Sequence, residues 1–216
     1  MTFRIDRRPP VGTKEVEAFV RIYEKSFALE QRDDTRELLT GLIDGELLCV
    51  LALIDDAVVG FAIVLPLDDL HIGFLEYLAV DPEHRNQHFG SLLLEYLRGA
   101  VDPAKSMVGL LWEVEPPAEH QGGEGTEDQL RRQRIAFYER NGAVVVDGAL
   151  LYRAPASTGS GTIPFWLMWL PLGSRDDPVP PTGELLPCYV TGILVRGYGL
   201  EEEDPLVRDV ISDLAC

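Results

Sequence analysis

The chain has 216 residues, 46% of them hydrophobic, which suits one α/β domain with a full apolar core. Its formal net charge of -17 argues against a nucleic-acid partner, because phosphate contacts need clustered lysine and arginine; the same charge suits a cationic substrate such as an amine. No apolar stretch reaches the roughly 18–20 residues of a membrane-spanning helix, so no membrane partner is expected.

The three cysteines, Cys49, Cys188 and Cys216, have neither a metal-binding spacing nor an even number for a disulfide framework. The histidines also share no ligand spacing, so no metal site is predicted. Cysteines without a disulfide framework make a reducing cytoplasm the natural compartment. The basic N-terminus lacks the apolar segment of a signal peptide. For that terminus we favour a frayed or lightly docked segment over a site for an anionic partner.

Hydrophobic spacing predicts five elements in the first part of the chain: helices over 14–29 and 36–43, then strands over 47–54, 57–67 and 72–80. Asp33, Asp34 and Thr35 can cap the second helix, which is expected to stop near Gly45. The pair Asp55-Asp56 joins the first two strands as a hairpin.

The second part of the chain continues with alternating helices and strands. The predicted elements are a helix from Ser91 to about Val101, a strand over 107–114, a loop over 115–127, a helix over 129–141 capped by Gly142, strands over 143–146 and 149–153, a linker over 154–162, a strand over 163–172 and a closing helix over 184–199. This order predicts an α/β fold, a mixed sheet flanked by helices. We expect a core over 1–153, with 154–216 as a linker plus a strand and helix that complete or extend the same domain.

The segment 74–97 holds the most informative motif. An apolar strand ends at Val80-Asp81-Pro82, a short polar turn follows, and an apolar helix begins near Ser91. Such a turn presents free backbone N–H groups and a positive helix end to a phosphate. The residues from Arg85 to Ser91 resemble the pyrophosphate loop of the GNAT-type N-acetyltransferases, Arg/Gln-x-x-Gly-x-Gly/Ala, with His88 in place of the first glycine.

This resemblance implies the GNAT acyltransferase fold and acetyl-CoA as co-substrate. The backbone of the strand end would pair with the pantetheine arm, and the amides of the loop would bind the diphosphate. The residues implied for cofactor binding are Leu78, Ala79, Val80, Arg85, Asn86, Gln87, His88, Phe89, Gly90, Ser91 and Phe137. Arg85 can approach a phosphate or brace the loop, and His88 either strains the turn or contacts a phosphate itself.

A second motif lies at the end of the predicted helix over 129–141. The run Phe137-Tyr138-Glu139-Arg140-Asn141-Gly142 is similar to the GNAT segment Phe-Tyr-x-x-x-Gly-Phe, although Ala143 replaces the final Phe. By this resemblance Tyr138 is the general acid that protonates the leaving thiolate. Taken alone, Tyr138 would be better explained as an aromatic side chain at a helix end that packs on the core, and only its combination with the loop over 85–91 favours the functional role.

Glu76 is the predicted general base. In an extended strand it shares a face with Phe74, Leu78 and Val80, and a carboxylate inside so apolar a run is costly to bury without a partner. It would take the proton of the substrate ammonium; a rim carboxylate or an internal ion pair is the alternative. Glu113 and Glu115 on the next strand are further candidates for the base or for holding a cationic substrate.

Together these patterns predict an N-acetyltransferase that moves an acetyl group from acetyl-CoA to a primary amine by direct attack on the thioester. A GNAT-fold protein that binds CoA as a sensor remains an alternative, favoured by His88. A nucleotide-binding α/β protein is a weaker one, since the chain lacks a Walker-type Gly-Lys-Ser/Thr. The acceptor is open between a small molecule and a peptide or protein amine, and the protein between a monomer and a homodimer.

Overall fold

The computed structural model describes residues 2–100, 107–117, 126–147, 152–156, 161–172 and 179–214. They divide into two compact units whose segments alternate along the chain. The first unit draws on the segments 1–66, 73–106 and 156–160, and the second on 67–72, 107–155 and 161–216. The predicted division at residue 153 stays a prediction.

The first unit is built on four strands in the order β1 (Phe3–Asp6), β2 (Leu48–Ile54), β3 (Ala57–Leu67) and β4 (Ile72–Val80). The pairs β1–β2 and β2–β3 are antiparallel. Asp55 and Asp56 connect β2 to β3 with φ values of 44° and 68°. A two-residue type I′ hairpin turn requires such positive φ values at both of its central residues. The predicted strands over 57–67 and 72–80 are confirmed at both ends.

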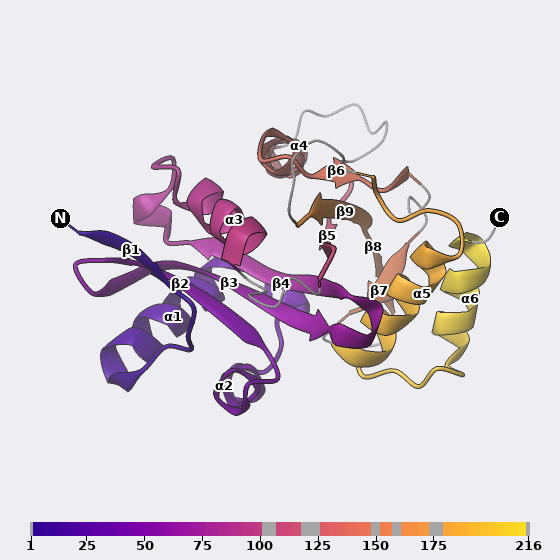
Figure 1. The fold of residues 1–216 in the computed structure, drawn as a ribbon, viewed down its shortest axis with the longest axis horizontal. Coiled ribbons are helices and arrows are strands. Elements are labelled where there is room, and N and C mark those ends of the chain that lie inside the picture. The colour runs from indigo at the N-terminus through magenta and orange to yellow at the C-terminus, as the bar shows by residue number, and fades with distance from the viewer. Residues whose placement is uncertain are drawn as a thin grey trace. The chain divides into compact units, whose positions relative to one another are not determined.

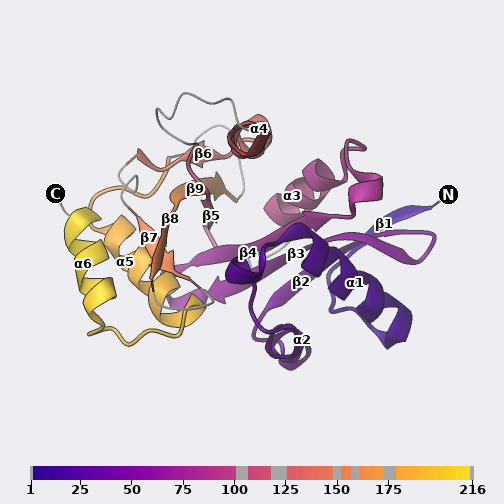
Figure 2. The same cartoon turned by 180° about the vertical axis from the view of Figure 1, so that it is seen from behind.

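Three helices cover this sheet. The helices α1 (Gly12–Ser26) and α2 (Thr35–Asp44) lie on one face and α3 (Phe89–Ala100) lies on the other (Figures 1 and 2). Alternate strand residues fill the core under α1 and α2: Cys49, Leu51, Leu53, Phe61, Ile63, Tyr77 and Ala79. Asp34 caps α2 by accepting hydrogen bonds from the backbone N–H groups of Arg36 and Glu37, and the left-handed Gly45 ends the helix, as predicted.

The N-terminus is an edge strand, so the prediction of a frayed or lightly docked segment was wrong. Four residues of β1 pair with β2. Arg4 within this strand and Arg8 after it both have carboxylate partners. Arg4 forms ion pairs with Asp6 and Asp56, and Arg8 binds Glu15 of α1 at 2.7 Å. These acidic partners occupy the guanidinium groups of Arg4 and Arg8.

Three strands of the second unit pair in the order β5 (Gly109–Val114), β9 (Trp166–Pro171) and β6 (Val144–Val145), and β9 is antiparallel to both of these neighbours. A separate hairpin pairs β7 (Arg153–Pro155) with β8 (Thr162–Pro164). The helices of this unit are α4 (Thr126–Arg140), α5 (Leu185–Gly192), a π-helical turn over Ile193–Gly197, and α6 (Pro205–Leu214).

Several sequence predictions for this unit need correction. The predicted linker over 154–162 begins and ends in the paired strands β7 and β8, and the predicted strand over 163–172 is interrupted at Phe165, whose N–H donates to the carbonyl of Tyr152. The closing helix becomes α5 plus the π-helical turn, and α6 was not predicted. Most of the predicted loop over 115–127 and of the strand over 149–153 lies outside the described residues.

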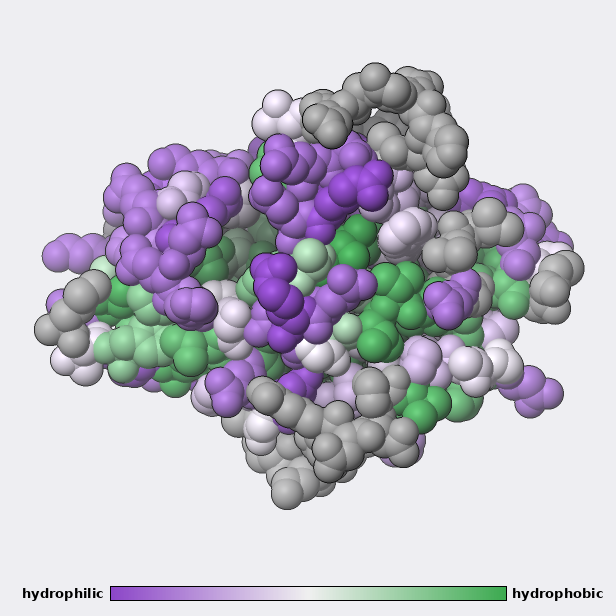
Figure 3. All heavy atoms as spheres, turned by 90° about the horizontal axis from the view of Figure 1, so that it is seen from above, coloured by the Kyte–Doolittle hydropathy of each residue, from purple (hydrophilic) through white to green (hydrophobic). Residues whose placement is uncertain are grey.

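The described surface is mixed in character. Figure 3 shows one face on which hydrophobic residues reach the surface between hydrophilic ones. Large apolar side chains exposed over the described residues include Leu29, Ile43, Leu130 and Val179. Within the described part of the chain, every helix is too short or too polar to cross a bilayer.

Candidate functional site

The predicted phosphate loop is a strained turn between β4 and α3. After β4 ends at Val80, a single 3-10 turn over Pro82–His84 leads into an exposed segment with left-handed backbone at Asn86 (φ 61°) and His88 (φ 64°). Left-handed conformations cost a non-glycine residue roughly 1–2 kcal/mol. The position usually taken by glycine in the GNAT loop thus has the positive φ that the resemblance implied, and His88 adopts it.

The loop ends where α3 begins, and this leaves the first amides of the helix without an acceptor inside it. The N–H of Leu92 donates to the carbonyl of His88 at 3.0 Å, which makes His88 the residue that starts the helix. The N–H groups of Phe89, Gly90 and Ser91 precede this first helical bond, so the helix itself cannot satisfy them. Together with the positive end of the helix dipole, they suit an anion.

Arg85 braces the loop in this structure. Its side chain is exposed, and its Nε donates to the carbonyl of Val80 at 3.4 Å, across the base of the turn. Gln87 makes a similar side-chain contact with the carbonyl of Glu83, at 3.5 Å. This contact is one that a brace would make, and the role of Arg85 toward a phosphate stays a prediction.

Asp81 holds the other end of the turn. It is only 3% exposed, and its carboxylate accepts a hydrogen bond from the N–H of Glu83 at 3.1 Å, which caps the 3-10 turn. Asp81 was not among the predicted site residues, although an Asp followed by Pro at the start of a turn is a recognisable capping signal.

The strand leading into the loop has the predicted alternation. Glu76, Leu78 and Val80 are half-buried, while Tyr77 and Ala79 are buried in the core under α1 and α2. On that opposite face the hydroxyl of Tyr77 donates to the carboxylate of Asp33 at 2.7 Å and so fixes the segment before α2. A side chain on Gly60 of β3 would lie 2.8 Å from the carbonyl of Ala79, which allows β3 and β4 to lie close at this point.

Phe137 and Tyr138 belong to the second unit, at the end of α4. Tyr138 is buried, and its ring lies 4.9 Å from that of Trp112 of β5 and 5.2 Å from that of Phe137. Burial raises the pKa of Tyr138 to about 12, although the nearby Arg134 opposes the rise. The hydroxyl therefore carries its proton at neutral pH, as a general acid must.

The two further acidic candidates on and after β5 differ in their partners. Glu113 is half-buried and accepts hydrogen bonds from the hydroxyls of Tyr152 and Tyr198, each at 2.5 Å. Burial raises the pKa of Glu113 to about 7, and these two hydrogen bonds limit the rise. Glu115 instead forms ion pairs with Arg131 and Arg134 of α4, at 3.4 and 3.2 Å.

The sequence patterns did not reveal the two tyrosines. Tyr152 and Tyr198 lie in segments predicted as a strand and a helix, and no local spacing links either of them to Glu113. Tertiary packing within the second unit brings them together.

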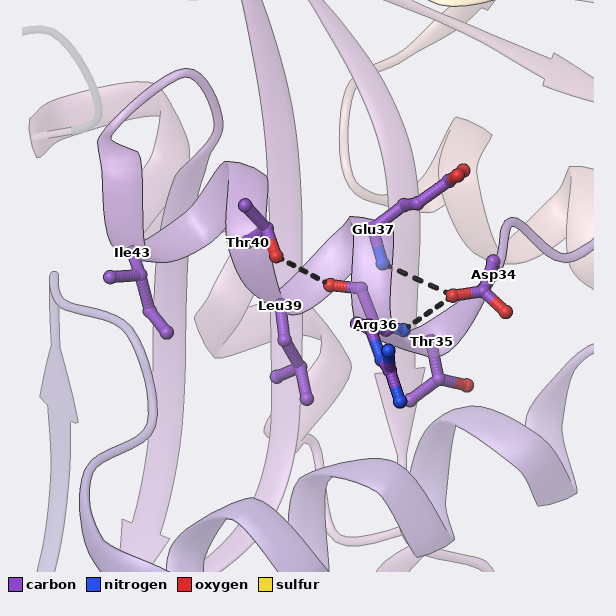
Figure 4. Close-up of a pocket in the computed structure, with 7 residues that line it drawn as sticks. All are labelled: Asp34, Thr35, Arg36, Glu37, Leu39, Thr40 and Ile43. Carbon is purple, nitrogen blue, oxygen red and sulfur yellow. Dashed lines mark hydrogen bonds between the residues drawn. The ribbon is translucent and has the colours of Figure 1, made fainter.

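A hollow along the exposed side of α2 contains none of the predicted site residues. It is lined by Asp34, Thr35, Arg36, Glu37, Leu39, Thr40 and Ile43 (Figure 4). The hydrogen bonds drawn there are local to the helix: the cap by Asp34, and a bond from the Thr40 hydroxyl to the Arg36 carbonyl. This hollow therefore reflects the shape of one helix. Among the described residues, no group of His, Cys, Asp and Glu side chains could hold a metal ion.

The model of the Acetyltransferase (GNAT) family matches residues 16–143, more than half of the chain. The chain therefore belongs to the GNAT acetyltransferase family, whose enzymes use acetyl-CoA. The match includes the phosphate loop, Glu76 and Tyr138, and it ends before Tyr152 and Tyr198. No curated protein sequence matches the chain.

Solved structures with the same fold include a putative GNAT acetyltransferase from Bacteroides thetaiotaomicron (20% identity, TM-score 0.67, 93% of this chain and 100% of that one). An aminoglycoside 6'-N-acetyltransferase complexed with coenzyme A is also similar (19% identity, TM-score 0.57, 81% of this chain and 99% of that one). So is the ribosomal-protein-S18-alanine N-acetyltransferase of Escherichia coli (21% identity, TM-score 0.54, 85% of this chain and 97% of that one). At these identities the likeness shows the fold.

Replacing His88 tests the strain in the loop. His88→Ala and His88→Gly both remove the imidazole, but only glycine adopts a φ of 64° without a steric cost. The free energy of unfolding in urea should therefore be about 1 kcal/mol higher for the glycine variant than for the alanine variant. At the exposed helical Glu95 the order should invert, with Ala more stable than Gly. Equal stability of the two His88 variants would show that the loop relaxes.

The Glu113 cluster predicts a pH dependence of stability. Because the pKa of Glu113 rises from 4.5 to about 7 on folding, the folded state holds the extra proton between these values. As the pH rises through this window, the free energy of unfolding of the wild type should therefore fall relative to that of Glu113→Gln, by at most about 3 kcal/mol. Above the window, the difference between the two proteins should stay constant. Urea unfolding across the window measures this, and the exposed Glu184→Gln should show no such trend.

Proposed function

We propose that this protein transfers the acetyl group of acetyl-CoA to a primary amine by direct attack of the amine on the thioester. The observation that carries the proposal is the left-handed turn at Asn86 and His88, which ends in the first amides of α3, in a chain of the GNAT family. The diphosphate of acetyl-CoA is the natural ligand of such a turn.

The loop from Arg85 to Ser91 would bind the diphosphate through its backbone amides. The backbone of Leu78, Ala79 and Val80 would pair with the pantetheine arm, and an N–H near Val80 would polarise the thioester carbonyl. Phe137 would pack beside the cofactor. Much of the rate would come from holding the amine and the thioester together, without a covalent enzyme intermediate.

Two side chains would move protons. Glu76 would take one from the substrate ammonium, so that the free amine attacks the carbonyl carbon. As the carbon–sulfur bond breaks, Tyr138 would donate its proton to the thiolate, and the second proton that the attacking nitrogen loses on becoming an amide would restore the hydroxyl. The raised pKa of Tyr138, about 12, keeps the hydroxyl protonated at neutral pH but also makes it a weaker acid, so the assignment rests on the position of Tyr138 in the matched GNAT segment.

The acceptor we propose is a cationic amine, carried by a small molecule or a peptide. The net charge of -17 supports this choice, since an acidic surface attracts cations. We further expect the protein to act in the cytoplasm, as a monomer or homodimer.

A CoA-binding sensor without turnover is the second candidate, and the strained His88 favours it. Calorimetry with acetyl-CoA, followed by a screen of amines for release of free thiol, separates the two. Binding with thiol release supports the transferase, binding with no release supports the sensor, and no binding contradicts both.

Tyr138→Phe tests the general acid. Loss of the hydroxyl should lower turnover roughly 10²-fold or more at neutral pH, with little change in acetyl-CoA affinity. Tyr189→Phe, at another buried tyrosine of the second unit, should leave turnover unchanged. An unaltered rate for Tyr138→Phe would remove this hydroxyl from the mechanism.

Glu76→Gln tests the general base. The rate should fall most at mid pH and recover as pH rises, because an amine that is already deprotonated needs no base. Glu95→Gln on the exposed side of α3 provides the control. A uniform loss at every pH would instead assign Glu76 to binding or folding.

A further inference from the structure

Asp81 is an unusual residue in the first unit. Of the acidic and basic side chains that the structure describes, it is the one in the buried class, 3% exposed. It lies between the end of β4 and the turn that begins the phosphate loop. A carboxylate in such a place is costly unless each oxygen has a partner.

Four interactions join Asp81 to three parts of the unit. Its backbone N–H donates to the carbonyl of Val59 in β3 at 2.8 Å, and its own carbonyl accepts from the N–H of His84 at 2.8 Å. One carboxylate oxygen caps the 3-10 turn through the N–H of Glu83, and the other binds the Arg21 guanidinium of α1 at 2.8 Å.

The ion pair with Arg21 differs from the surface pairs of this protein. The Asp81 side chain is 4% exposed and that of Arg21 is 44% exposed, so α1 brings a partly solvated cation to a buried anion. Removing one partner of such a pair leaves an uncompensated buried charge and costs far more than losing an exposed pair.

We propose that Arg21 is a positioning residue for the acetyl-CoA diphosphate, acting through Asp81; this rests on the proposed function. Arg21 keeps Asp81 charged and in place, Asp81 fixes the turn over Pro82–His84, and this turn sets the start of the strained segment at Asn86 and His88. Strained backbone persists only where its surroundings hold it. At the other end, Phe89 stacks on Phe3 of β1 with ring centres 5.0 Å apart.

The charges around Asp81 make the positioning role of Arg21 measurable through its dependence on pH. Burial acts to raise the pKa of Asp81, but the Glu83 amide, Arg21 and the nearby His84 together bring it below its ordinary value. Loss of Arg21 should raise this pKa, so that Asp81 takes up a proton at a higher pH and releases the turn.

Calorimetric titration of acetyl-CoA into four proteins tests the proposal: wild type, Arg21→Met, Asp81→Asn and the double variant. Arg21→Met should weaken binding roughly tenfold, and Arg21→Lys should recover part of the loss. The double variant should bind about as weakly as Asp81→Asn alone, because Arg21 acts only through Asp81. As the matched control, Arg132→Met breaks the exposed Arg132–Asp128 pair and should leave binding unchanged.

Lowering the pH separates positioning from a general loss of structure. As the pH falls from about 7 toward the ordinary aspartate range near 4, Arg21→Met should lose affinity at a higher pH than the wild type, while protonation of acetyl-CoA itself is common to both. The proposal would be overturned if Arg21→Met bound acetyl-CoA with wild-type affinity, or if the loss of binding free energy in the double variant equalled the sum of the two single losses. A wild type that binds no acetyl-CoA would instead refute the proposed function.

Discussion

The left-handed backbone at Asn86 and His88 is the constraint on which the proposed diphosphate site depends. It turns the chain between the end of β4 and the start of α3, where the amides of residues 89–91 precede the first helical hydrogen bond. Because neither residue is a glycine, this conformation is unfavourable by itself and needs support from its surroundings. Support comes from Asp81 at one end, the Arg85–Val80 brace across its base and the Phe3–Phe89 stack at the other end.

This arrangement reconciles an acidic protein with an anionic ligand. A chain with a net charge of -17 repels phosphates at long range, so binding has to come from short-range groups. Arg21 and Arg85 are both engaged, one by Asp81 and the other by the carbonyl of Val80. In the proposed site the backbone N–H groups and the positive end of the helix dipole would therefore be the main partners of the diphosphate.

The sequence predicted those parts of the fold whose signal is local. The strands β3 and β4 were predicted to the residue because each is an apolar run bounded by polar turns, and the cap of α2 was visible in Asp34. The short strand β1 was not, since four mixed residues show no periodicity. Asp81 was read only as part of a turn, because its burial depends on α1 and β3, which are distant in sequence.

The same reasoning applies to the segments that follow the family match. Glu113 lies within residues 16–143, but both of its hydrogen-bond donors lie outside, at Tyr152 and Tyr198. Arg196 also binds Asp69, and Gly192 leaves room for Leu70. Without the hydroxyls of Tyr152 and Tyr198, the half-buried carboxylate of Glu113 would lose the two hydrogen bonds that offset its desolvation. The C-terminal residues therefore share one unit with β5 and complete its polar interior.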